Sequence, residues 1–155
     1  MKARKNPKEV EGMKKAHVKD AVALCDFLSF LENEIVAGRY WSELSAAQRL
    51  GEYREQQEDF VGISFTTISA FGSNGAIIHY APTKETNKQI TNESLYLLDS
   101  GGQYKGGVPQ GGSDGCGLPC FRLPFYFSLF FTVYSFYCVC WCVLIPFSTG
   151  AHFSP

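Results

Sequence analysis

Two side chains in this sequence, Asp99 and His79, have types and settings that could take part in catalysis or metal binding. Asp99 follows the apolar run 95–98 and precedes Ser-Gly-Gly, a pattern that predicts a carboxylate where a strand ends in a turn. His79 lies inside the apolar run 76–80, where a buried imidazole needs a polar partner and often has a shifted pKa. Each also has a structural explanation, a satisfied core histidine and an Asx turn before Gly101. On their own, these residues do not reveal an activity.

The remaining histidine and cysteine positions point to structure rather than chemistry. His17 falls on the apolar stripe of a helical pattern, which predicts a histidine in the core or at its boundary. Cys25 falls in the same pattern and is expected to be buried and reduced. Cys116 and Cys120 form one Cys-x-x-x-Cys pair without a second pair, and the cysteines within 138–142 match no common zinc spacing. We therefore predict no metal site built from cysteines.

Two helices are predicted in the first part of the chain. Apolar residues recur every three or four positions from the Asn6-Pro7 pair to Gly38, which predicts a helix over 7–37. A capping-box pattern that starts at Ser45 predicts a second helix over 45–60. Both helices are amphipathic, so we expect them to pack together.

Three strands are predicted after the helices. Period-two runs and apolar runs bounded by turn residues predict strands over 63–69, 76–80 and 94–99, with a polar loop over 83–92. Helices followed by strands indicate an α+β fold with one small, mostly antiparallel sheet. We expect His79 and Asp99 to lie on neighbouring strands of that sheet.

Charge divides the chain into two unlike parts. Of the 14 Lys and Arg and 15 Asp and Glu residues, all but Asp114 and Arg122 lie at or before Lys105. The net charge of −1 gives no electrostatic argument for nucleic-acid binding. No apolar stretch follows the basic N-terminal residues, so we expect no signal peptide and a cytoplasmic location.

Longer motifs carry a resemblance to a known family. FTTISAFGSNGAIIHYAP at 65–82 and LYLLDSGGQYK at 95–105 resemble the opening of the catalytic domain of Xaa-Pro aminopeptidases (aminopeptidase P), which are pita-bread metallopeptidases. The segments 9–32 and 52–65 resemble the two helices of that domain and the start of its sheet. The resemblance implies an incomplete pita-bread fold of the creatinase and methionine aminopeptidase type. It implies a truncated N-terminal catalytic portion over 1–107, followed by an unrelated apolar tail over 108–155.

The resemblance also implies a metal centre and roles for the two candidate residues. Family members release the N-terminal residue from peptides with proline at the second position, use two metal ions, usually Mn²⁺, and form homodimers. Their metal pair activates a water molecule and stabilises the oxyanion. By resemblance, Asp99 is a metal ligand, and His79 is the catalytic histidine that assists proton transfer or holds the substrate carbonyl.

Most of the family's metal ligands have no counterpart in this chain. A second Asp, eleven residues after the first, bridges both ions in the family, and Gln110 stands at that position here. A neutral amide does not supply the negative charge that offsets dehydration of such ions. The family's remaining His and two Glu come later, but this chain has no Glu after Glu93, and its only later histidine is His152. We therefore expect one ligand of five, and no activity from the chain alone.

The uncharged run 123–147 has three interpretations. Its residues are largely those with U-rich and C-rich codons, which indicates a translated intron or a gene-model error. Its length also suits a membrane-spanning helix close to a C-terminal end, although the flanks carry little charge. Alternatively, the chain is an interaction fragment whose open sheet edges pair with full-length subunits. We expect the tail to be poorly ordered or an isolated helix with few contacts to the sheet.

Overall fold

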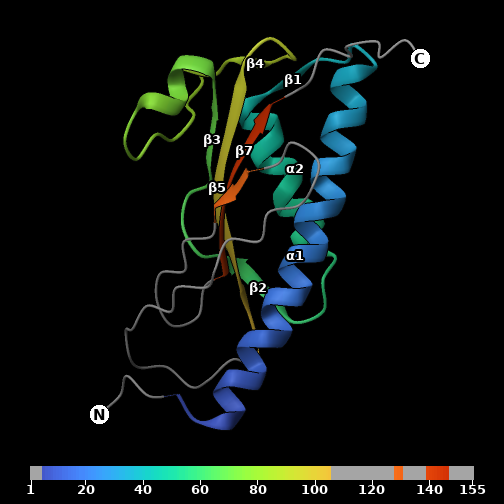
Figure 1. Cartoon of the computed structure of the whole chain (residues 1–155), viewed down its shortest axis with the longest axis vertical. Helices are drawn as coiled ribbons and strands as arrows, with labels where there is room; N and C mark the ends of the chain where they lie inside the picture. Colours follow the sequence, from blue (N-terminus) through green and yellow to red (C-terminus); the bar gives the residue numbers. More distant parts are fainter. Residues whose placement is uncertain (1–4, 106–127, 131–138, 147–155) are drawn as a thin grey trace, which may run out of the picture.

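The computed structural model of the chain describes residues 5–105, 128–130 and 139–146 (Figure 1). Within these residues, two helices are followed by short strands and one 3₁₀ turn, which confirms the α+β prediction. The helices are α1 (Pro7–Val36) and α2 (Glu43–Glu55). The strands are β1 (Trp41–Ser42), β2 (Phe60–Ile63), β3 (Ile68–Phe71), β4 (Gln89–Ile90), β5 (Leu95–Tyr104), β6 (Ser128–Phe130) and β7 (Val139–Pro146), and the 3₁₀ turn is η1 (Gly72–Ala76).

The first helix begins and ends where its capping residues predict. Asn6 caps α1 through a reciprocal pair of bonds, because its Oδ1 accepts from the Glu9 N–H at 2.9 Å and its own N–H donates to Glu9 at 2.7 Å. Gly38 adopts a φ of 72° and donates its N–H to the carbonyl of Ile35 at 2.9 Å. This left-handed backbone suits glycine and stops the helix.

The second helix begins earlier and ends earlier than predicted. Ser42, not Ser45, is the N-cap, and its Oγ accepts from the N–H of Ser45 at 3.3 Å. The helix ends at Glu55, because the chain turns at Asp59, whose φ is 66°, before entering β2 at Phe60. Residues 56–60, predicted as helix, therefore form the turn and the start of a strand.

The long strand β5 lies at the centre of the main sheet. β2 and β3 both pair antiparallel with β5, so the predicted single strand 63–69 is in fact two short strands with a break between them. β5 extends five residues beyond Asp99, which shows that the predicted turn at Ser100 to Gly102 is wrong. Pairing explains the difference, since β2 reaches Gly102 through Ile63, and the Ser64 N–H donates to the carbonyl of Gly101 at 2.9 Å.

The predicted strand 76–80 is absent from the structure. η1 covers Gly72–Ala76, and a turn follows in which the Tyr80 N–H donates to the Ile77 carbonyl at 3.3 Å. Hydrogen bonds from the Asn74 side chain to Glu43 and to the Tyr80 hydroxyl hold this segment, so these polar contacts outweigh its apolar pattern. The polar segment after Pro82 is a loop as far as β4, which pairs with β1.

The tail contributes two strands to the sheet, contrary to expectation. β7 pairs antiparallel with the second edge of β5, from Leu95 opposite Pro146 to Gly102 opposite Val139, and β6 pairs with β7. An extended segment placed there satisfies backbone N–H and C=O groups that an open edge would leave unpaired. The rest of the run 123–147 lies outside the described residues. No helix in the described ranges combines the length and the apolar character needed to cross a membrane.

Both helices pack against one face of the main sheet, α1 mainly on β5 and α2 mainly on β3 and β2, and this contact forms the core. Figure 1 shows α1 running along the sheet with α2 beside it. Cys25 does not join this core and is exposed, contrary to prediction, because the buried side of α1 runs through its neighbours Leu24 and Phe27. The largest apolar members of the core are Leu24, Phe27, Leu31, Leu50, Ile90, Tyr96 and Leu98.

Candidate functional site

Asp99 lies in the middle of β5 and on the sheet face opposite the helices. Its neighbours Leu98 and Ser100 are fully buried on the helix side, and side chains alternate between the two faces of a strand. Asp99 is directly opposite Ile68 of β3 and opposite position 142 of β7. It is half-buried and has no hydrogen-bond partner in the part of the chain that the structure describes. Burial raises the pKa of this carboxyl group above its usual value.

His79 lies in the turn after η1, not on a strand beside Asp99. Its backbone has a φ of 56°, and its side chain is exposed. The flanking Ile77 and Ile78 are also exposed, at 54% and 85%. The structure therefore does not bring His79 and Asp99 together in one sheet, and the predictions of a buried histidine and of neighbouring strands are both wrong.

A buried ionic cluster lies behind Asp99, on the helix side of β5. Arg54 of α2 binds Asp20 of α1 in a bidentate pair, with N–O distances of 2.8 and 3.0 Å, and both side chains are fully buried. Arg54 also donates to the hydroxyl of Ser100 at 3.2 Å, while Tyr104 donates to Asp20 at 2.8 Å. Burial and the nearby Asp20 charge raise the pKa of Tyr104. This cluster fixes both helices to the half of β5 that follows Asp99.

A second buried cluster surrounds Glu43, the first residue of α2. Its carboxylate accepts from the Phe71 N–H at 2.6 Å, from Asn74 Nδ2 at 2.9 and 3.1 Å, from the Tyr80 hydroxyl at 2.7 Å and from the Lys88 N–H at 3.1 Å. Burial is the main reason that the pKa of Tyr80 is raised, and hydrogen bonding to Glu43 raises it further. One carboxylate thereby connects α2 with β3, η1 and the loop before β4.

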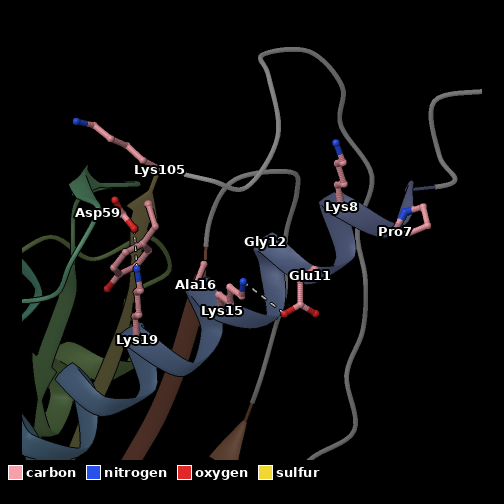
Figure 2. A pocket seen from close by; sticks show the side chains of 10 residues that line it. Pro7, Lys8, Glu11, Gly12, Lys15, Ala16, Lys19, Asp59 and Lys105 are labelled. Carbon is pink, nitrogen blue, oxygen red and sulfur yellow. Dashed lines mark hydrogen bonds and ion pairs between the residues drawn. The ribbon is translucent and has the colours of Figure 1, made fainter.

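A surface pocket of about 440 Å³ lies between the start of α1 and the end of β5 (Figure 2). Figure 2 shows Lys19 reaching from α1 to Asp59, at 2.8 Å, and Lys15 approaching Glu11, at 3.7 Å. The charged groups that line this pocket are thus largely paired with one another. Neither Asp99 nor His79 lines it, so it is separate from the candidate catalytic residues.

Residues 11–109 match the family model described as "Metallopeptidase family M24". This stretch is more than half of the chain and contains both His79 and Asp99. The chain belongs to metallopeptidase family M24. Its two helices and antiparallel strands are the opening part of the M24 pita-bread fold.

The M24 relatives of this chain are Xaa-Pro aminopeptidases. Xaa-Pro aminopeptidase ApepP of Drosophila melanogaster is 45% identical over 108 residues, which cover 70% of this chain and 18% of the relative. Xaa-Pro aminopeptidase 1 of Dictyostelium discoideum is 49% identical over 110 residues, covering 69% and 17%. The crystal structure of X-prolyl aminopeptidase from Caenorhabditis elegans superposes with a TM-score of 0.65 at 37% identity, over 67% of this chain and 17% of that one. The chain therefore spans less than a fifth of the length of these relatives.

Asp99 is not part of a cluster of potential metal ligands in the part of this M24 chain that the structure describes. The solved relative is described as a cytosolic enzyme with a di-nuclear active site. Here, among the side chains described for residues 5–105, no group of three or more His, Cys, Asp or Glu could hold a metal ion. Asp99 stands without a second carboxylate on the adjacent strand β3, where Ile68 is its partner. Gln110 and His152 lie outside the described residues.

Sequence reasoning missed three buried charged residues, Asp20, Glu43 and Arg54, whose hydrogen bonds join the helices to the strands and loops of this M24 segment. Asp20 was detectable, because it falls on the buried stripe of α1 between His17 and Leu24. Glu43 and Arg54 gave no such signal, since both belong to a helix whose polar positions resemble a solvent-exposed face. The prediction of His17 as a boundary histidine is confirmed. It is half-buried, and burial lowers its pKa, although Asp20 partly offsets the shift.

Proposed function

We propose that residues 1–107 are the N-terminal part of an Xaa-Pro aminopeptidase catalytic domain, that residues 108–155 are an unrelated tail, and that this 155-residue chain does not hydrolyse peptides on its own. The observation that carries the proposal is the isolation of Asp99. Two divalent ions need several carboxylate or imidazole ligands, because negative ligand charge must offset their dehydration. The residues that surround Asp99 in the described structure do not fit such a centre.

In this proposal, Asp99 and His79 occupy the positions of family site residues but do not take part in catalysis in this chain. Asp99 corresponds to a ligand of one of two ions, which we take to be Mn²⁺, and His79 to the histidine that serves the substrate carbonyl or a proton transfer. A single carboxylate is a poor site for such ions, because one negative charge does not offset their dehydration. The substrate class that the family position implies is a peptide with proline second. We propose a cytoplasmic location, which the solved cytosolic relative supports.

A second proposed function is association with full-length Xaa-Pro aminopeptidase subunits. Exposed apolar side chains support it, because apolar surface that another chain covers stabilises the association. They occur on two strands and on the turn that carries His79: Val61 at 57%, Ile63 at 52%, Leu95 at 52%, Ile77 at 54% and Ile78 at 85% exposed. Co-expression with a full-length subunit and size-exclusion chromatography test this proposal. Separate elution of the two chains at micromolar concentration would exclude it.

The peptidase proposal is tested with the purified full chain and the peptide Arg-Pro-Pro. We expect no release of arginine at any Mn²⁺ concentration, and no difference between the wild-type chain and the Asp99→Ala or His79→Ala variants. Hydrolysis that rises with Mn²⁺ and disappears in Asp99→Ala would overturn the proposal. It would mean that this chain assembles a complete site from residues that the proposal treats as unrelated.

A further inference from the structure

The Glu43 carboxylate is fully buried and receives hydrogen bonds from four groups that lie far apart in the sequence. Two donors are backbone N–H groups, those of Phe71 and Lys88, and two are the buried side chains of Asn74 and Tyr80. A charged acceptor in a low-dielectric site makes stronger hydrogen bonds than a neutral one. This carboxylate therefore ties the segment 71–88 to the first turn of α2.

The backbone of Glu43 anchors the same cluster to the sheet. Its N–H donates to the Lys88 carbonyl at 3.0 Å, and its own carbonyl accepts from Ser69 Oγ at 2.7 Å. Ser69 Oγ lies 2.8 Å from the hydroxyl of Tyr96, a fully buried residue of β5. The Glu43 cluster is consequently continuous with the core strand that carries Asp99.

His79 lies within the segment 71–88, which the Glu43 cluster holds, and it directly precedes Tyr80, a member of that cluster. Its side chain is exposed and makes no hydrogen bond to another described residue, so its own contacts do not fix its position. Its backbone has a positive φ of 56°, which costs free energy for a non-glycine residue unless the surroundings impose it. The following residue, Tyr80, is 5% exposed and donates its hydroxyl to Glu43 at 2.7 Å.

We propose that Glu43 is a positioning residue for His79. It acts through Tyr80 and Asn74, which hold the turn on both sides of the strained histidine backbone. The family position of His79 rests on the proposed function above, whereas the positioning by Glu43 rests on the contacts just described. Among the described residues, Glu43 makes no hydrogen bond to Asp99.

The test compares Glu43→Gln with Glu52→Gln in the full-length chain. Both remove one negative charge from α2, but Glu52 is bound only by the neighbouring helix residues Arg49 and Gln48. The readouts are the NMR signals of the His79 imidazole, assigned with His79→Gln, and amide hydrogen exchange. In Glu43→Gln we expect a shifted His79 signal, and at least about tenfold faster exchange at Ile77 and Tyr80, because the charge-assisted hydrogen bonds of the carboxylate are weakened or lost. Exchange in β5 should stay slow, and Glu52→Gln should change neither readout.

Two results would overturn the positioning role. One is an unchanged His79 signal in a folded Glu43→Gln variant, and the other is faster exchange spread equally over β5 and 71–88, which would indicate a merely structural role. If Glu43→Gln does not fold, Tyr80→Phe removes a single donor and leaves the other three in place. That variant should shift the His79 signal, and an unshifted signal would contradict the proposal. Neither readout depends on hydrolysis, so observed activity would overturn the proposed function alone.

Discussion

The ionised form of Asp99 is unfavourable at its half-buried position on β5. Burial favours the neutral carboxyl group, so its pKa in the folded chain lies above that in the unfolded chain. Such a group stabilises the fold below its unfolded pKa of about 3.9, and this contribution is lost as the pH rises through the folded pKa. At neutral pH, the burial of Asp99 therefore lowers the free energy of unfolding.

Asp99→Asn is expected to raise the urea midpoint at pH 7, because the amide mimics the neutral carboxyl group. The gain should shrink as the pH falls and vanish below about pH 3.9, where Asp99 is protonated in both states. Urea denaturation from pH 3 to 8 measures this, with the exposed Asp26→Asn as control. An Asn variant that is less stable than the wild type at pH 7 would show that Asp99 has a stabilising partner.

Gly102 of β5 lies so close to the buried Asp20–Arg54 pair that a side chain there would meet Asp20. A Cβ added there would lie 2.6 Å from Asp20 Oδ1 and 3.0 Å from the ring of Tyr104. Gly62→Ala is the matched control, because a Cβ on that β2 glycine meets nothing within 4 Å. We expect Gly102→Ala to lower the free energy of unfolding by about 1–3 kcal/mol through overpacking, and Gly62→Ala to leave it nearly unchanged. Equal effects in urea denaturation would contradict this close approach.

At the scale of elements, the Asp20–Arg54 pair joins α1, α2 and β5. Removal of one partner leaves the other charge buried and uncompensated, so Asp20→Asn and Arg54→Met should each cost about 3–5 kcal/mol of unfolding free energy. The double variant should cost much less than the sum, because no buried charge remains. Glu11→Gln, in an exposed pair on α1, should change stability by less than about 1 kcal/mol. Additive losses in the double variant would contradict coupling between the two residues.

The elements differ in how far the sequence predicts them, for physical reasons. α1 was predicted within one residue, because its capping box and Gly38 act locally. The segment 76–80 was mispredicted as a strand, because Glu43, some thirty residues earlier, holds the turn through Asn74 and Tyr80. The apolar run that predicted this strand carries no information about such distant partners. Asp99 was correctly placed on a strand, but the extension of that strand depends on pairing with β2, which is also non-local.

At the scale of the whole molecule, the tail is the largest departure from expectation. β7 fills the second edge of β5 along eight residue pairs, and its position opposite Asp99 is 142. The low charge of the tail and its richness in residues with U-rich and C-rich codons predicted a tail separate from the fold. Pairing at a strand edge depends mainly on backbone N–H and C=O groups, so many sequences can form it. β7 thus pairs with the second edge of β5, and the sequence of β7 contains no carboxylate for a two-metal site.

The central claim is that this M24 segment does not form a metal centre, and Mn²⁺ binding tests it most directly. Free Mn²⁺ gives a six-line electron paramagnetic resonance signal that weakens when the ion is bound by protein. We predict that the full chain, at concentrations up to about 100 μM, leaves the signal of equimolar Mn²⁺ unchanged, because a lone carboxylate does not offset the dehydration of the ion. Asp99→Ala should give the same trace. A signal that decreases with the wild-type chain and is restored by Asp99→Ala would contradict the claim.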